Sequence, residues 1–167
     1  MNQYLRQLLW FGIDSPFGPI SLGFIDDTLV EVIFDYRDSL IRKKTRSIDR
    51  AIQAFKRYFE GRREFFNDIS IDISCGSPFE KKVWLALRRI PYGKTISYAS
   101  IAESIGHPKA ARAVGRAIGR NPVPIVIPCH RVIRSNGSLG GFSGGIDIKK
   151  KLLELEGAIK NPVSISL

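Results

Sequence analysis

The pattern of apolar residues changes near the middle of the chain, at Cys75-Gly76-Ser77-Pro78. Before this point, short apolar runs alternate with turn-forming Asp, Ser, Pro and Gly residues, which predicts an antiparallel meander. These runs are residues 8–13, 19–25 and 29–34, and we expect a further short strand at residues 69–74. After this point, apolar residues recur at the three- and four-residue spacing of helices. The sequence therefore predicts an α+β fold of two domains, residues 1–75 and residues 76–167.

Helix signals stand on both sides of this boundary. One amphipathic helix is expected to cover the sheet, because four apolar residues share one helical face and Gly61 follows as a C-terminal cap. The four residues are Ile48, Ile52, Phe55 and Phe59. The segment Ser77-Pro78-Phe79-Glu80 matches a capping box with proline at the first helical position, so a second helix is expected to begin there.

The chain is strongly basic, since 26 Lys and Arg against 16 Asp and Glu give a net charge of +10. This excess favours a polyanionic partner such as DNA, and a basic, solvated surface without such a partner is the alternative. No apolar stretch reaches the roughly 18 residues of a membrane span, and no signal peptide is recognisable. We therefore expect a cytoplasmic protein, or a nuclear one in a eukaryote, with no membrane partner.

The two cysteines, Cys75 and Cys129, are expected to be free thiols in such a compartment. Cys75 lies at the domain boundary and is interpreted as buried or incidental. With only two histidines, His107 and His130, and no Cys-x-x-Cys spacing, no structural zinc site is expected. His107 is interpreted as a turn residue.

Two short helices joined by a tight turn are predicted after residue 96. Ser97 can cap a helix that begins near Tyr98, and Gly106-His107-Pro108 ends it. A second helix is expected over residues 109–120. This arrangement is the sequence form of a DNA-binding helix-turn-helix.

The second of these helices carries two unusual stripes. Arg112, Arg116 and Arg120 line up beside a stripe of small residues, which are Ala111, Gly115 and Gly119. Two glycines inside a helix cost about 1 kcal/mol each, so a compensating contact is expected. Close approach to DNA phosphates is one explanation, and close packing against another helix with solvated arginines is the alternative.

Cys129 follows a segment that cannot be helical, because residues 121–128 contain three prolines. We expect a stiff, extended and mostly buried leg that delivers Cys129 to a fixed place. A thiol near its ordinary pKa of about 8.5 is only slightly ionised at neutral pH, so a base is needed. His130 is the candidate, and it would reach the thiol through a tight turn or, as we favour, a bridging water.

Two further features surround this cysteine in the predicted fold. Glu156 borders the apolar stripe in the last turn of the final helix, where it could orient His130 in a triad, or it could be a surface glutamate. The loop Gly140-Gly141-Phe142-Ser143-Gly144-Gly145 could wall a pocket for a flat ligand, with Phe142 stacking and Ser143 hydrogen bonding. A plain flexible connector is the alternative reading of the loop.

Taken together, Asn121-Pro122-Val123-Pro124, Pro128-Cys129-His130-Arg131-Val132, Phe142-Ser143-Gly144-Gly145 and Leu155-Glu156-Gly157 resemble the O6-alkylguanine-DNA alkyltransferase family. The resemblance is strong from residue 77 to residue 157. It implies a ribonuclease-H-like N-terminal domain with a sheet and a covering helix, and a helical C-terminal domain with a helix-turn-helix. It also implies direct DNA repair by a monomer without a cofactor, in which an alkyl group moves once and irreversibly from guanine O6 in double-stranded DNA to the cysteine as a thioether.

The resemblance also assigns roles to residues of this chain. Cys129 is the acceptor, His130 the base acting through water, Glu156 its partner and Asn121 a hinge of the leg. Tyr98 would hydrogen-bond or donate a proton to guanine N3 while contacting DNA. The expected base-binding residues are Val132, Phe142, Ser143 and Gly144. The expected DNA-binding residues are Ala111, Arg112, Gly115 and Arg116, with Arg112 filling the place of the flipped base in a helix that enters the minor groove.

This sequence departs from the family pattern at two points. Phe142 stands where tyrosine often occurs, and the ligands of an N-terminal zinc site found in some members are absent, so no metal is expected. Three rival functions are a recognition module of the same fold, a helix-turn-helix regulator and a cysteine hydrolase. Recognition modules of this kind lack the reactive cysteine, so Cys129 argues against the first.

Overall fold

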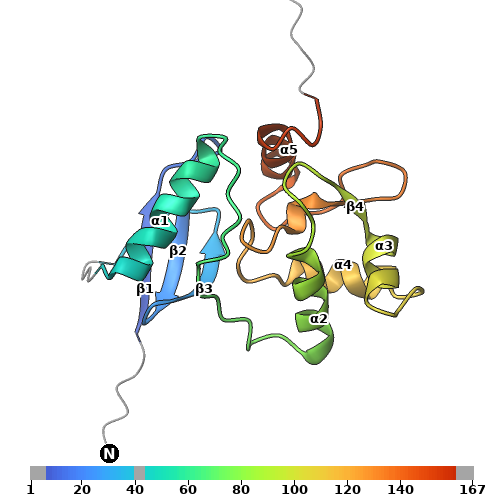
Figure 1. Cartoon of the computed structure of the whole chain (residues 1–167), viewed down its shortest axis with the longest axis horizontal. Coiled ribbons are helices and arrows are strands. Elements are labelled where there is room, and N and C mark those ends of the chain that lie inside the picture. The colour runs from blue at the N-terminus through green and yellow to red at the C-terminus, as the bar shows by residue number, and fades with distance from the viewer. Residues whose placement is uncertain (1–6, 40–43, 161–167) are drawn as a thin grey trace, which may run out of the picture.

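The computed structural model describes residues 7–39 and 44–160 and has an α+β architecture (Figure 1). A three-stranded antiparallel sheet and α1 form one side of the molecule, and four further α-helices gather on the other. No helix in the described part of the chain is long and apolar enough to cross a membrane.

The predicted meander is present, with each strand within one residue of its expected bounds. Strands β1 (Leu8–Ile13), β2 (Ile20–Ile25) and β3 (Thr28–Ile33) pair in chain order. Both faces of the central strand β2 are covered, because residues on each face are buried. On one of them, the Ser21 hydroxyl donates to the carbonyl of Asp35 at 2.8 Å, which satisfies a polar group that burial would otherwise penalise.

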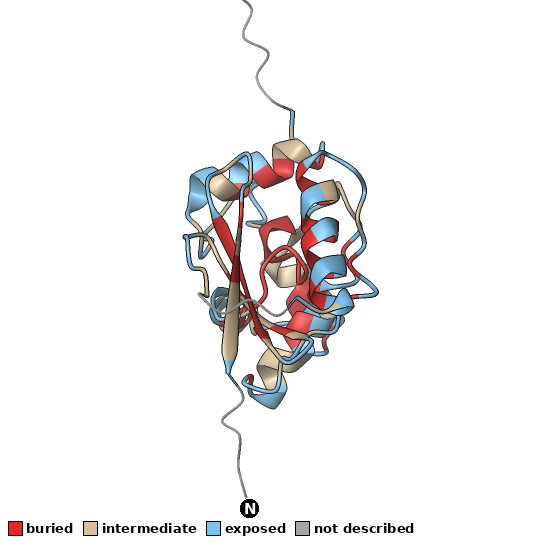
Figure 2. Ribbon diagram, turned by 90° about the vertical axis from the view of Figure 1, so that its left-hand side faces the viewer, coloured by how far each residue is buried: buried red, intermediate tan, exposed pale blue. Residues whose placement is uncertain are grey.

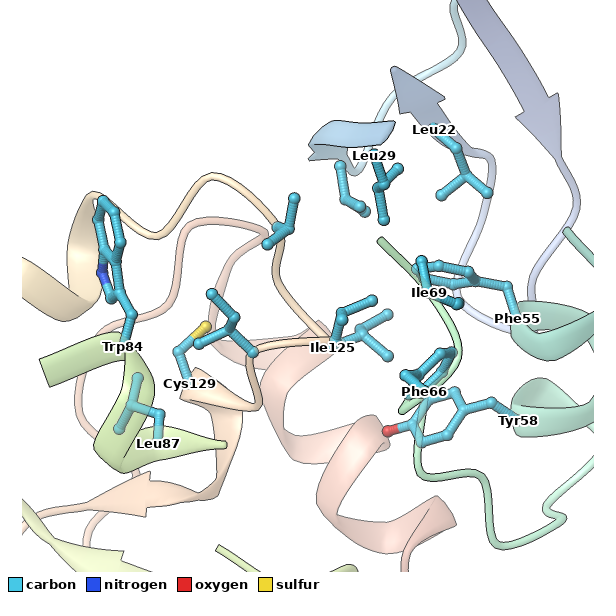
Figure 3. Packing of buried hydrophobic residues seen from close by; sticks show 14 of the residues in the cluster. Leu22, Leu29, Phe55, Tyr58, Phe66, Ile69, Trp84, Leu87, Ile125 and Cys129 are labelled. Atoms are coloured by element: carbon cyan, nitrogen blue, oxygen red, sulfur yellow. The ribbon is translucent and has the colours of Figure 1, made fainter. Parts of the chain in front are cut away.

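The expected covering helix is α1 (Arg46–Phe59). Thr45 caps its N-terminus by accepting the amide of Ile48, and Gly61 follows its end with a φ of +78°, a backbone conformation that glycine adopts readily. The buried face of α1 packs on the sheet, and Figure 2 shows that buried segments lie between the sheet and the helices. The buried hydrophobic residues form one continuous cluster, which runs from Phe55 and Ile69 through Ile125 to Leu87 on the side of the four further helices (Figure 3).

The strand expected at residues 69–74 is wrong in its extent. Only Ile71 pairs, in an isolated parallel bridge with Leu29. The chain leaves the sheet directly afterwards because the Asp72 carboxylate accepts the backbone amide of Ser74 at 2.6 Å, which turns the backbone. Cys75, which follows, is exposed rather than buried.

The remaining helices are α2 (Pro78–Leu87), α3 (Tyr98–Ser104), α4 (Ala111–Gly119) and α5 (Ile146–Leu155). The capping box of Ser77 and Glu80 is present in both of its hydrogen bonds, and Ser97 caps α3 as expected. The indole of Trp84 in α2 donates to the carbonyl of Ala117 in α4 at 2.8 Å. This bond fixes the packing of α2 against α4 because both groups are buried.

The leg before Cys129 is buried, as expected, but it is not extended throughout. It turns at Ile125, whose φ of +75° is rare for a β-branched residue. The amide of Ile127 closes this turn on the carbonyl of Val123 at 3.0 Å. Prolines exclude a helix here, but they leave a tight turn possible between them, and tertiary packing selects it.

Gly76 provides a test of this packing, because a Cβ atom there would lie 2.3 Å from the Trp84 ring. We expect Gly76→Ala to lower the free energy of unfolding by about 1–3 kcal/mol, since the buried indole cannot move aside freely. Gly119→Ala is the matched control, because no atom lies within 4 Å of its added Cβ. Urea denaturation should show the control unchanged or up to about 1 kcal/mol more stable, and equal stabilities of the two variants would show that the Trp84 ring does not restrict residue 76.

Candidate active site

A short parallel strand pair brings the candidate residues of the site together. In this pair, β4 (Ile96–Ser97) runs beside β5 (Val132–Ile133). Tyr98 follows β4 directly at the start of α3, and Cys129 lies in the short 3-10 helix Cys129–Arg131 that precedes β5. Two residues that are 31 positions apart in sequence are thereby placed next to one another in the fold.

A cavity of about 530 Å³ opens in front of Cys129. It is lined by residues from the start of α3, from α4, from the segment after β5 and from the glycine-rich loop. These are Tyr98, Arg112, Gly115, Ile118, Gly119, Cys129, Arg134, Gly140, Gly141, Phe142 and Ser143. Six of the predicted site residues therefore share one cavity: Tyr98, Arg112, Gly115, Cys129, Phe142 and Ser143.

The other predicted residues lie around this cavity or behind it. His130 and Glu156 are buried behind the cysteine, and Val132 is buried at the start of β5. Asn121 is buried in the leg. The backbone of Gly144 faces the Phe34 ring, which a Cβ atom there would meet at 2.6 Å. Two residues of α4 lie on its outer side: Ala111 is partly exposed and Arg116 is exposed.

The carboxylate of Glu156, at the end of α5, is the centre of a buried hydrogen-bond network. Its Oε1 accepts from Tyr58 at 2.7 Å and from Arg131 Nη2 at 2.9 Å, and it lies 2.7 Å from His130 Nε2. Its Oε2 accepts from Arg131 Nε at 2.8 Å and from the amide of Gly93 at 3.1 Å. Glu156 is therefore not the surface glutamate of the alternative reading but a fully satisfied buried anion.

These contacts determine which proton His130 carries. Burial alone would raise the pKa of Glu156, but the bonds from His130 and Arg131 outweigh it and lower that pKa. Burial lowers the pKa of His130, so the imidazole is held neutral. A neutral ring beside an ionised carboxylate must donate through Nε2, which leaves Nδ1 as an acceptor. Nδ1 is buried and makes no hydrogen bond to any residue in the described part of the chain.

Cys129 is itself buried, and burial raises the pKa of its thiol to about 11. A hydrogen bond from Asn121 and the positive charge of Lys149 act in the opposite direction. The Asn121 amide also donates to the carbonyl of Ile127 at 2.8 Å and accepts the amide of Val123 at 3.1 Å. Asn121 thus connects both ends of the leg to the thiol that the leg carries.

Lys149 is a completely buried lysine in α5. Its ammonium donates to the carbonyl of Val132 at 2.6 Å and to that of Gly141 at 3.3 Å. Burial lowers the pKa of Lys149 to about 8, and its Nζ lies 6.0 Å from the centre of the Tyr98 ring. A buried cation near a thiol favours the thiolate, which is the nucleophilic form.

The outer face of α4 keeps its arginines and glycines accessible. Arg112 and Arg116 are exposed and make no ion pair within the described residues, whereas Arg120 pairs with Glu80 at 2.9 Å. Gly115 has ordinary contact with the Tyr98 ring, and no atom lies within 4 Å of a Cβ at Gly119. The stripe therefore has open space at Gly119, whereas Gly115 contacts the first residue of α3.

The glycine-rich loop is packed against its surroundings. Gly140 has a φ of +71°, and a Cβ there would lie 2.7 Å from the Tyr98 hydroxyl. The Phe142 ring contacts Phe34 edge-on at 5.3 Å and His130 at 6.5 Å. The loop is thus a wall of the cavity, held partly by an aromatic residue from the sheet side of the molecule.

Four residues of this site were given no role by the sequence. Arg131 belongs to the recognised Pro128-Cys129-His130-Arg131-Val132 motif but had no role of its own, and Lys149 lies in a lysine run that suggests only solvent exposure, although it shares the buried face of α5 with Leu152 and Leu153. That shared face was the available signal. Tyr58 is indistinguishable from a core aromatic residue in the sequence, and Arg134 follows β5 without any motif.

A buried thiol at the floor of a cavity, beside a basic helix face, defines a protein that does chemistry on a ligand through one cysteine. Comparison with known proteins specifies the family. Residues 78–158 match the family model for the DNA-binding domain of 6-O-methylguanine DNA methyltransferase. The methylated-DNA–protein-cysteine methyltransferase of Mycolicibacterium paratuberculosis is 43% identical over 160 residues, which cover 93% of this chain and 95% of the relative.

Further relatives agree with this match. The methyltransferase of the same name from Methanosarcina acetivorans is 44% identical, with 87% of this chain and 96% of the relative covered. A crystal structure of the Mycobacterium tuberculosis OGT protein in complex with DNA superposes with a TM-score of 0.77 and 41% identity, covering 88% of this chain and 92% of that one. The chain belongs to the methylated-DNA–protein-cysteine methyltransferase family.

Lys149 can be tested through the reactivity of the Cys129 thiol. In a Cys75→Ser background, Lys149→Met should slow alkylation of Cys129 by iodoacetamide at pH 7.5 by roughly 3- to 10-fold, because loss of the cation raises the pKa of the thiol by about half a unit to one unit. Lys150→Met is the control, since that lysine is half exposed. Equal rates for the two variants would show that Lys149 does not stabilise the thiolate.

Proposed function

We propose that this chain repairs DNA directly, by moving an alkyl group from guanine O6 in double-stranded DNA to the sulfur of Cys129. The observation that carries the proposal is the position of Cys129 at the floor of a cavity that it shares with Tyr98 and Arg112. Two of the relatives named above are methylated-DNA–protein-cysteine methyltransferases, and the Mycobacterium tuberculosis OGT protein is in complex with DNA in its crystal structure.

The first chemical step is loss of the thiol proton from Cys129. His130 Nδ1 is the free acceptor behind the cysteine, and we infer that it takes this proton through a water molecule. Glu156 stabilises the imidazolium that results, because it is already ionised and aligned with Nε2. The positive charge of Lys149 stabilises the thiolate on the other side.

The thiolate then attacks the alkyl carbon on guanine O6. A carbon–sulfur bond forms while the carbon–oxygen bond breaks, and the electron pair of the broken bond stays on the guanine. The Tyr98 hydroxyl donates a proton to guanine N3 and neutralises this charge; burial raises the pKa of Tyr98, so the hydroxyl is protonated at neutral pH. The Tyr98 phenolate then regains a proton from solvent, and the His130 imidazolium releases one to solvent, which balances the step. The product is a thioether, which water does not hydrolyse, so each molecule reacts once.

The cavity walls supply the contacts to the base. Phe142 packs against one face of the guanine, and the Ser143 hydroxyl contacts O6 from the exposed end of the loop. The backbone of Val132 and Gly144 completes the site. The Val132 carbonyl is held in place by the Lys149 ammonium at 2.6 Å and keeps a second lone pair for the base edge.

We infer that α3 and α4 form a helix-turn-helix, with α4 against the minor groove. The bare stripe of Ala111 and Gly115 allows the backbone to approach the duplex, and Arg116 reaches the phosphates. Arg112 lines the cavity mouth and fills the place that the flipped base leaves. Flipping costs a few kcal/mol, which these contacts offset.

The finer organisation is part of the same proposal. Residues 1–75 form a ribonuclease-H-like domain and residues 76–167 form the domain that binds DNA and accepts the alkyl group. The proposed reaction needs only a monomer, because one chain supplies every residue proposed for the chemistry. Its location is the cytoplasm, or the nucleus if the source is a eukaryote.

The decisive experiment counts transferred alkyl groups. Duplex DNA with a labelled O6-methylguanine should leave one labelled methyl group per protein molecule on Cys129, as located by peptide mass spectrometry. Cys129→Ala should abolish the transfer, and Cys75→Ser should leave it unchanged because Cys75 is exposed and is not one of the residues that line the cavity. Label on another residue, or more than one turnover per molecule, would exclude the proposal.

This experiment also separates the rival functions. A recognition module or a helix-turn-helix regulator would bind duplex DNA without taking up label, and a regulator would ignore the lesion. A cysteine hydrolase would turn over esters or peptides repeatedly.

Arg112 is tested by comparing two substrates. Arg112→Ala should slow the reaction with an O6-alkylguanine in duplex DNA at least 10-fold, because the flipped state loses a contact worth over about 1.4 kcal/mol. Its reaction with the same alkylguanine as a free base should change little. Arg62→Ala removes one exposed positive charge from the sheet side and serves as the control. An equal loss on both substrates would assign Arg112 to the chemistry instead.

A further inference from the structure

Tyr58 is the one described side chain of the sheet side that hydrogen-bonds to the buried carboxylate of Glu156. It belongs to α1 and is completely buried. Its hydroxyl donates to Glu156 Oε1 at 2.7 Å and lies 3.5 Å from His130 Nε2. The phenol and the imidazole therefore share one oxygen atom of the same carboxylate.

Packing alone does not require a hydroxyl at this position. The Tyr58 ring contacts Phe59 at 5.5 Å and Phe66 at 5.6 Å between ring centres, in a cluster of phenylalanines that also includes Phe55. Figure 3 shows Tyr58 beside Phe66, with its oxygen directed away from these rings. A phenylalanine would fill the same volume, so the hydroxyl serves the network around Glu156.

Further charged and titratable groups of the described residues surround this network, including Arg63, which lies 6.0 Å from the centre of the Tyr92 ring. Arg131 donates to both carboxylate oxygens, and the Gly93 amide donates to Oε2. Lys149 acts on His130 through its positive charge, and Tyr92 lies 6.1 Å from Tyr58 between ring centres. Of these groups, only Arg131 Nη2 also donates to Oε1, the oxygen that Tyr58 and His130 share.

We propose that Tyr58 is a positioning residue through which the sheet side of the molecule sets the strength of the Glu156–His130 hydrogen bond. The proposal rests on the function proposed above, because it concerns the base that activates Cys129. A donor on Oε1 withdraws electron density from the oxygen that His130 contacts, so it weakens the attraction of the carboxylate for an imidazolium. The hydroxyl also limits rotation of the carboxylate.

The direction of the effect follows from the charges. Without the hydroxyl, the Glu156 carboxylate has one donor fewer and stabilises protonated His130 more strongly. His130 then becomes neutral only at higher pH, so the acid limb of the alkyl-transfer rate moves to higher pH. We expect a change of about half a pH unit, which is roughly threefold in the protonation equilibrium.

Nuclear magnetic resonance of the two histidines tests this directly. In protein labelled with ¹⁵N-histidine, Tyr58→Phe should move the titration midpoint of His130 upward by about half a pH unit. His107 is exposed and is the internal reference. Tyr92→Phe is the matched control, because it removes a hydroxyl whose bond to the Leu155 carbonyl is long, at 3.4 Å. A His130 midpoint that does not differ between wild type and Tyr58→Phe, or that moves equally in the control, overturns the proposal.

A second variant removes dependence on the folding of Tyr58→Phe. Replacing Tyr58 by 3-fluorotyrosine keeps the hydroxyl and makes it a stronger donor, so the His130 midpoint should move downward instead. The pH dependence of single-turnover alkyl transfer should follow the same two directions. The histidine titration needs no DNA, so its outcome is independent of the alkyl-transfer assay that tests the proposed function. If the His130 midpoint does not move downward in the 3-fluorotyrosine protein, the proposal is also overturned.

Discussion

The rest of the site depends on the hydrogen bonds that the buried Glu156 carboxylate accepts. A buried anion is costly unless every lone pair is used, and here five hydrogen bonds from four residues meet it. Those residues come from α1, the loop after α2 and the helical turn of Cys129. The same charge therefore holds two sides of the molecule together and selects the histidine tautomer that faces the cysteine.

Cys129 lies in buried surroundings that oppose ionisation of its thiol. Burial raises the pKa of the thiol to about 11, which favours the protonated and less nucleophilic form in the free protein. Two neighbours offset the cost of ionising the buried thiol: Lys149 through its positive charge, and His130 as the proposed base. In the proposed reaction, the thiolate forms with a guanine base in the cavity, which suits a nucleophile that reacts once.

Local signals predicted the elements well, and tertiary contacts explain the failures. Ser77, Ser97 and Gly61 act within a few residues of their own positions, so the helix ends could be read from the sequence. The turn at Ile125 depends on packing, and the role of Lys149 depends on carbonyls from two distant segments. The cysteine, histidine and glutamate were recognisable because their motifs are local, whereas Tyr58 gave no signal beyond that of a core residue.

None of the described residues of the sheet side lines the cavity, yet several of them contact the segments that form it. The amide of Val32 donates to the carbonyl of Pro122 in the leg at 2.9 Å, and the Phe34 ring supports Phe142. With the Tyr58 hydroxyl, these contacts reach the leg of the nucleophile, the wall of the base pocket and the partner of the base. A shift between the two sides would therefore disturb the leg, the glycine-rich loop and the Glu156 carboxylate together, so the sheet side supports all three parts of the proposed site.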